Sequence, residues 1–207
     1  MAAACAGSST HGMDRVLIRP ATRGDLARIT EIYNHYVVHT PVTFDVEPYT
    51  VERRAPWFEQ FALTGRYRLL VAEEITQSVA ENARKDAAKN SAEDSAKNAA
   101  GEKSNLIGYA GTTRFRPKAA YETTVETTIY CAPESTGKGI GRRLYAELFA
   151  ALAAEDINRI VAGYTLPNPA SAVLHSRFGF KPIGIFSEVG RKFGRYWDVA
   201  WNERPLR

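Results

Sequence analysis

The chain has 207 residues, of which 44% are hydrophobic and 11% aromatic, so it can bury one good core, about one domain's worth. Its formal net charge of +4 is too small and too dispersed to indicate nucleic-acid binding, and no run of apolar residues is long enough to predict a membrane span. Cys5 and Cys131 do not form a secreted disulfide framework, and residues 1–13 lack a signal-peptide core. We therefore expect a cytoplasmic protein with a disordered tail over residues 1–13.

The first half of the chain predicts a strand followed by two helices. Val16–Pro20 reads as a strand that ends at a proline. Asp25 is a candidate N-cap for a helix whose apolar residues recur at helical spacing, namely Leu26, Ile29, Ile32, Tyr33 and Tyr36. The loop Thr40–Asp45 follows, and its side chains could form one wall of a pocket. A second helix is predicted over Val51–Leu63, with an apolar side formed by Trp57, Phe58 and Phe61.

Two predicted strands, Leu69–Glu73 and Leu106–Thr113, are separated by a long segment of unusual composition. Residues 76–105 consist mainly of Ala, Asn, Lys, Ser, Glu and Asp, with almost no aliphatic or aromatic side chain to anchor them. Loops tolerate added length at small entropic cost. We therefore predict a low-complexity insertion between two strands that leaves the fold intact.

The second half of the chain predicts a strand at Val125–Cys131, then a helix, a strand, a helix and two strands. The first of these helices carries one apolar stripe, formed by Leu144, Tyr145, Leu148, Phe149 and Leu152. After the strand Ile160–Tyr164, Asn168 and Pro169 are a well-formed N-cap and first position for a helix ending at Gly179. Residues 180–186 and 196–201 are expected to form a final antiparallel pair. The element order predicts an α+β layer architecture.

A glycine-rich loop precedes the first of those helices. Gly137, Gly139 and Gly141 alternate along Thr136–Leu144, so backbone N–H groups can turn toward one point, with the positive end of the helix dipole behind them. Such a loop can hold phosphate. Its spacing fits neither a Walker loop nor a dinucleotide fingerprint. A plain glycine-rich turn that caps a helix is the alternative.

The loop resembles the pyrophosphate loop of the GCN5-related N-acetyltransferases (GNAT), which has the pattern Arg/Gln-x-x-Gly-x-Gly/Ala. Thr136 stands where that family carries Arg or Gln, although the backbone donors do not depend on this side chain. Four further segments resemble phosphinothricin and methionine sulfoximine N-acetyltransferases: Phe115–Tyr121, Thr124–Tyr130, Asn168–Ser171 with Leu174 and His175, and Lys192–Asp198.

This resemblance implies a single GNAT domain over residues 14–207, interrupted by the insertion. The GNAT fold is a mixed, mostly antiparallel sheet with helices on both faces. Acetyl-CoA is the implied cosubstrate, the implied acceptor is the amine of a small amino-acid-like molecule, and the implied assembly is a homodimer. No metal site, nucleic-acid partner or membrane contact is predicted.

The resemblance also implies which residues hold the cofactor. The loop would bind the pyrophosphate through Gly137, Lys138, Gly139, Ile140, Gly141 and Arg142. Backbone groups of Ile129, Tyr130 and Cys131 would bind the pantetheine arm and acetyl group. Asn168 is similar to a cofactor-contacting asparagine of the family, although its role as N-cap is sufficient to explain it.

Two residues match catalytic positions of the family. Glu126 matches the proposed general base, and burial on an apolar strand would raise its pKa toward that task, unless it faces outward. His175 stands where many relatives have a tyrosine that protonates the leaving thiolate, and a packed or capped histidine is the alternative. Cys131 could suggest an acetyl-cysteine intermediate. We instead expect direct transfer, which the resemblance implies.

The acceptor site is expected between two strands. Arg116, Lys118 and Tyr121 look like the substrate-anion residues of the family, because a guanidinium clamps carboxylate or phosphinate oxygens bidentately. Exposed loop cations are the alternative, and for Lys118 the better one. Thr43 and Phe44 are weaker candidates for the opposite wall. Two competing functions remain at this point: a protein N-terminal or lysine acetyltransferase, and a non-catalytic acyl-CoA-binding regulator.

Overall fold

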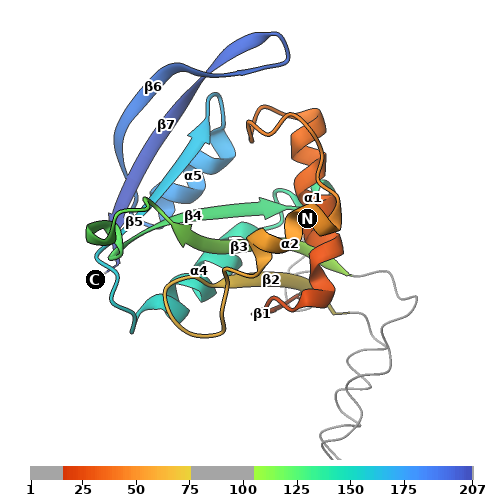
Figure 1. The fold of residues 1–207 in the computed structure, drawn as a ribbon, viewed down its shortest axis with the longest axis vertical. Helices are drawn as coiled ribbons and strands as arrows, with labels where there is room; N and C mark the ends of the chain where they lie inside the picture. Colours follow the sequence, from red (N-terminus) through yellow and green to blue (C-terminus); the bar gives the residue numbers. More distant parts are fainter. Residues whose placement is uncertain (1–15, 76–104, 207) are drawn as a thin grey trace, which may run out of the picture.

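A computed structural model describes residues 16–75 and 105–206, so the tail at 1–13 and the insertion up to residue 104 lie outside the described residues (Figure 1). The described strands form one seven-stranded sheet in the order β1-β2-β3-β4-β5-β7-β6. The elements are β1 (Val16–Pro20), α1 (Leu26–His39), α2 (Val51–Phe58), β2 (Leu69–Glu74), β3 (Leu106–Arg114), β4 (Thr124–Cys131), α4 (Ile140–Leu152), β5 (Arg159–Thr165), α5 (Pro169–Arg177), β6 (Lys181–Lys192) and β7 (Arg195–Pro205).

Helices cover both faces of this sheet. Side chains of β2 alternate between two apolar clusters: Leu70 and Ala72 pack on the face covered by α4, whereas Leu69 and Val71 pack on the face covered by α1 and α2. The predicted stripe of α4 is buried in the first cluster. The mixed sheet with two helical layers confirms the predicted α+β architecture.

Two local predictions in the first half are wrong. The second helix ends at Phe58 rather than Leu63. Pro56 removes a backbone donor within it, and Phe61 turns back so that its ring packs edge-on against Trp57 at 4.9 Å. Asp25 is the residue before α1, but its side chain does not cap that helix. Its carboxylate instead accepts from the Thr22 backbone N–H at 2.7 Å and pairs with Arg19.

The sheet divides into two branches between β4 and β5. These strands are parallel and pair only from Thr124↔Arg159 to Glu126↔Val161. Beyond Glu126, β4 continues to Cys131 beside β3, while β5 continues to Thr165 beside β7. The two strands therefore separate into a fork that begins at Glu126.

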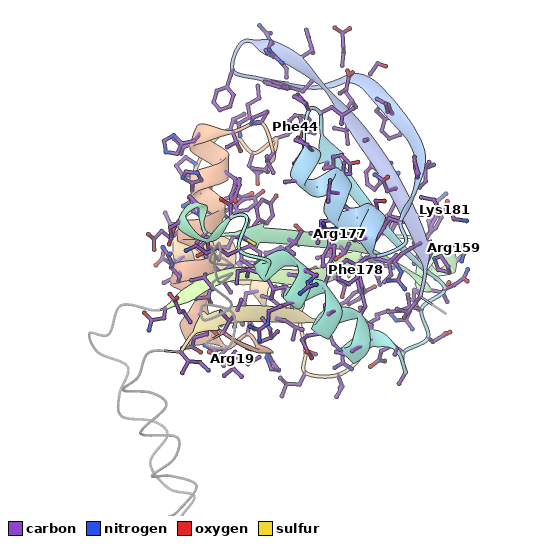
Figure 2. The ribbon with its side chains drawn as sticks, turned by 180° about the vertical axis from the view of Figure 1, so that it is seen from behind. Arg19, Phe44, Arg159, Arg177, Phe178 and Lys181 are labelled. Carbon is purple, nitrogen blue, oxygen red and sulfur yellow. The ribbon has the colours of Figure 1, made fainter. Side chains whose placement is uncertain are left out.

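The β6–β7 hairpin extends well beyond the rest of the sheet, toward the loop that follows α1 (Figure 1). Phe44, in that loop, lies directly against Gly190 of β6, where an added Cβ would come within 2.2 Å of the Phe44 ring (Figure 2). The contact between Phe44 and Gly190 therefore joins the loop after α1 to the β6–β7 hairpin. No helix among the described residues is long and apolar enough to cross a membrane.

Candidate active site

The glycine-rich loop takes up the backbone geometry that its sequence predicts. Gly137 and Gly139 have φ values of 76° and 77°, in the left-handed region that favours glycine. Gly139 is the N-cap of α4, so the N–H groups of Ile140, Gly141 and Arg142 begin the helix without helical acceptors. These donors face the same end of the helix, at which the dipole also attracts an anion.

A cleft of about 410 Å³ lies between the end of β4, the glycine loop and α5. A second cavity of about 530 Å³ continues past the loop and shares four residues with the cleft: Gly137, Gly139, Arg142 and Arg177. Figure 2 shows Arg177 where α5 approaches α4. Lys138 also lines the second cavity. Three cations and a row of backbone donors fit a bound pyrophosphate.

Both flanks of the cleft contain residues predicted to hold the cofactor. Ile129, Tyr130 and Cys131 line it from β4, in the part of the strand that no longer pairs with β5. Asn168 lines it from the start of α5, where its Oδ1 accepts from the Ser171 N–H at 3.0 Å and confirms the predicted N-cap. An extended chain can therefore enter the fork along the free edge of β4, as a pantetheine arm requires.

Cys131 is poorly suited to act as a nucleophile. Burial raises the pKa of its thiol to about 11, so little thiolate is present near neutral pH. Its carbonyl oxygen accepts a hydrogen bond from the Tyr36 hydroxyl at 2.6 Å. This environment favours direct transfer over an acetyl-cysteine intermediate.

Glu126 is the last residue of β4 that pairs with β5, so it lies at the base of the fork, although it is not among the residues that line the cleft. Its side chain is half-buried, and burial raises its pKa, against the nearby Arg116 guanidinium, which lowers it. A carboxylate with a raised pKa accepts a proton more readily than an ordinary glutamate. The position and the pKa both suit a general base.

His175 is buried within an aromatic group rather than among the residues that line the cleft. Its Nδ1 lies 2.7 Å from the carbonyl oxygen of Ser171 and must donate to it, which leaves Nε2 to accept from the Tyr145 hydroxyl at 3.1 Å. The ring also stacks on Tyr164, and burial lowers its pKa. This placement favours the packed histidine that the sequence left open over a proton donor.

The predicted acceptor residues fall into two groups. Arg116, Lys118 and Tyr121 are exposed on the segment between β3 and β4, where Arg116 lies 4.9 Å from the Phe115 ring centroid. Only Arg116 of these three is close enough to Glu126 to act on its pKa. Thr43 is buried in the loop after α1, and Phe44 packs on the hairpin.

Thr43 belongs to a polar group that the sequence analysis did not identify. Its hydroxyl lies 2.6 Å from the Tyr33 hydroxyl, which also donates to Asp45. The backbone carbonyl oxygen of Thr43 accepts a hydrogen bond from Lys192 Nζ at 2.8 Å. We name these residues, together with Arg54 of α2, the acceptor-side cluster. In the sequence, Tyr33 shows only the helical periodicity of an apolar face. Lys192 is the one member of this cluster that lies in a segment resembling the family, Lys192–Asp198.

The family comparison agrees with this geometry. Residues 90–201 match the model of a GNAT acetyltransferase domain. The chain belongs to this family, and it is an acetyl-CoA-dependent N-acetyltransferase.

Individual relatives cover nearly the whole chain. A phosphinothricin N-acetyltransferase of Streptomyces coelicolor is 48% identical over 94% of this chain and 99% of its own. An L-methionine sulfoximine/L-methionine sulfone acetyltransferase of Salmonella typhimurium is 31% identical over 91% of this chain and 94% of its own. The crystal structure of a phosphinothricin acetyltransferase from Sinorhizobium meliloti in complex with acetyl-CoA superposes with a TM-score of 0.75, at 30% identity over 93% of this chain and 89% of that one.

Within the described ranges, no group of three or more His, Cys, Asp or Glu side chains is arranged to hold a metal ion.

Proposed function

We propose that the protein transfers acetyl from acetyl-CoA directly to the amine of a small amino-acid-like acceptor of the phosphinothricin, methionine sulfoximine or methionine sulfone type. The observation that carries this proposal is the position of Glu126 at the base of the fork, on the same strand as Ile129, Tyr130 and Cys131, which line the cleft beside the glycine loop. The activities named for the relatives support the acceptor class.

Each step has a residue suited to it. Acetyl-CoA supplies a thioester that reacts with a neutral amine. Glu126 takes the proton of the amine, directly or through one water, because its raised pKa makes it a better base. Backbone groups of Ile129 to Cys131 orient the acetyl group and stabilise the charge that develops on its oxygen. The departing sulfur needs no buried acid, because a thiol has a pKa of about 8.5 and water can protonate the thiolate.

Steady-state release of free thiol tests the acceptor class. The purified protein is mixed with acetyl-CoA and a panel containing L-phosphinothricin, L-methionine sulfoximine, L-methionine sulfone, the common amino acids and a peptide with a free N-terminus. We expect turnover with the three analogues and little with the peptide. Turnover confined to the peptide would transfer the proposal to a protein acetyltransferase, and binding of acetyl-CoA with no turnover would indicate a regulator.

We further propose one domain over residues 14–207, in which residues 76–105 are an insertion in the β2–β3 hairpin. Support comes from the antiparallel pairing of these strands and from the Glu74 N–H, which donates to the Asn105 carbonyl oxygen at 2.9 Å. Replacing residues 77–103 by a short Gly-Ser turn should leave acetyl-CoA affinity within about twofold, because loop length carries little free energy. Loss of affinity would contradict this assignment.

We also propose a cytoplasmic location. The free thiol of Cys131 supports it, and cell fractionation tests it.

The same proposal includes a homodimer. β6 is an edge strand, and its exposed apolar side chains are Ile183, Ile185, Phe186 and Val189. Edge strands with exposed apolar side chains are prone to pair with another chain. A second copy that packs on β6 would cover them.

A further inference from the structure

Arg54 is a buried cation that the proposed chemistry does not yet use. It lies on α2 and is only 6% exposed. Its guanidinium carbon stands 3.8 Å from the centroid of the Tyr33 ring and 4.1 Å from that of Trp57, so two aromatic faces enclose it. Its Nε is buried without a hydrogen-bond partner, and the Tyr109 hydroxyl, which is also buried and unpaired, lies near enough for the Arg54 side chain to act on its pKa. Most buried polar nitrogens in proteins are paired, so this one requires an explanation.

The positive charge of Arg54 also lacks a counter-ion. Among residues 16–75 and 105–206, no carboxylate forms an ion pair with it. Asp45 is the carboxylate of the acceptor-side cluster; it accepts from Tyr33, and its charge acts on the pKa of Lys192. Lys192, which is also buried, brings a second cationic side chain to the cluster. Arginine stays protonated in proteins, and a buried charge is stable only when it is compensated.

The cluster borders the face of the sheet on which Glu126 lies. Side chains of a strand alternate, so Glu126, Thr128 and Tyr130 of β4 share one face. The Tyr130 ring meets the Tyr33 ring edge-on at 5.1 Å. Tyr33 in turn reaches from the Arg54 guanidinium to the Thr43 hydroxyl. Arg54 therefore lies next to Tyr33, which contacts Thr43 and Tyr130, and Tyr130 shares a face of β4 with Glu126.

We propose that Arg54 is a specificity-determining residue that provides the counter-charge for an anionic oxygen group of the acceptor, an inference that rests on the proposed transfer to amino-acid amines. The acceptor group is the α-carboxylate or an oxoanion of its side chain, and both have the same charge and oxygen geometry. Arg116, beside Glu126, remains available for the other polar end of the acceptor. Binding of a zwitterion then supplies the anionic partner that no carboxylate among the described residues gives to Arg54.

The test compares Arg54→Met with its neighbour Arg53→Met. Arg53 is exposed and pairs with Glu47 at 3.7 Å, so it is a matched control on the same helix. Three acceptors separate the two anion sources: L-methionine sulfone, which has a carboxylate; its carboxamide, which has no anion; and 3-aminopropyl(methyl)phosphinic acid, which has an oxoanion and no carboxylate. Acetyl-CoA affinity and the melting temperature are measured for every variant.

We expect Arg54→Met to lower kcat/KM about 10-fold or more for the acceptor whose anion Arg54 compensates, mainly through KM, and to leave the carboxamide nearly unchanged. Arg54→Lys should recover part of the loss, and Arg53→Met should change none of the three. Equal losses for the anionic acceptors and the carboxamide, or no loss at all, would overturn the role of Arg54. Failure of the unaltered protein to acetylate any acceptor would instead overturn the proposed function itself.

Discussion

Glu126 combines a position and a pKa that ordinary strand glutamates do not have. It stands where β4 and β5 separate, and burial raises its pKa while Arg116 limits the rise. A glutamate on the exposed face of a strand would have neither property. Its leverage is bounded, because an α-amino group titrates near about 7.7–8.0, so presenting a neutral amine at pH 7 costs only about 1–1.5 kcal/mol.

Replacing Glu126 by Gln is therefore expected to lower kcat/KM by about 5- to 10-fold near pH 7, and by less at pH 9, where the amine is already neutral. The pH profile of kcat/KM measures this. In the unaltered protein the rate should fall as pH drops through the raised pKa of Glu126.

The raised pKa of Glu126 also predicts the sign of an effect on stability. The folded state binds a proton at Glu126 more tightly than the unfolded state does, so ionised Glu126 costs stability above that pKa. Glu126→Gln should melt at a higher temperature than the unaltered protein at pH 8. A rate loss that is the same at every pH would contradict the role of base.

His175 provides the contrasting case at this scale. Replacing it by Phe removes two hydrogen bonds and leaves the buried Tyr145 hydroxyl with Thr127 as its remaining side-chain partner. We expect the free energy of unfolding to fall by about 1–3 kcal/mol, while the pH profile of kcat keeps its shape. Urea denaturation and the kcat profile measure the two effects. Disappearance of one limb of the profile at unchanged stability would restore His175 as a proton donor.

The glycine loop and the fork act as elements rather than as single side chains. Gly137 has φ 76°, open space around its missing Cβ, and a place in the lining of the cleft. Gly179, after α5, has φ 78° and equally open space, but does not line the cleft. The two glycines therefore share backbone strain and differ in contact with the cofactor site.

Gly137→Ala and Gly179→Ala should each lose about 1–2 kcal/mol of stability, because both place a side chain in the left-handed region. Only Gly137→Ala should also weaken acetyl-CoA binding, by about tenfold, since its methyl group enters the phosphate cradle. Isothermal titration calorimetry and thermal unfolding separate the two effects. Equal affinities for both variants would show that the loop does not contact the cofactor.

Most elements could be predicted from the sequence because their signals are local. The apolar stripe of α4 and the Asn168 cap of α5 are fixed by residues within one or two turns. The strands of the last hairpin are longer than the sequence predicts. β6 runs to Lys192 and β7 to Pro205, through glycines and charged residues with little strand propensity. Pairing with a neighbouring strand, rather than propensity, extends them.

The candidate site divides in the same way. Glu126 and the glycine loop lie in contiguous motifs, so resemblance could indicate them. Arg54 could not be recognised, because in the sequence it is one of two adjacent arginines on a short polar helix. Its burial depends on Tyr33 from another helix. Contacts between distant segments leave no periodic signal.

At the scale of the whole molecule, the exposed apolar side chains of β6 predict the surface through which two copies of the protein pair. Ile185 is 58% exposed on this edge strand. Ile185→Glu should convert a dimer into a monomer, because it places a charge in an apolar contact. Leu63→Glu, at a residue 71% exposed outside β6, is the matched control and should leave the mass unchanged. Size-exclusion chromatography with light scattering gives the mass. A monomeric unaltered protein would contradict the proposed assembly.

The central claim is that the acetyl group reaches the nitrogen of a small amino-acid-like acceptor. Its most direct test is a competition in which the protein receives isotopically labelled acetyl-CoA together with equimolar L-methionine sulfone and a peptide with a free N-terminus, followed by mass spectrometry of every component. The account predicts label on the amine of L-methionine sulfone and none retained on the protein. Label on the peptide, or on Cys131 of the protein, would contradict it.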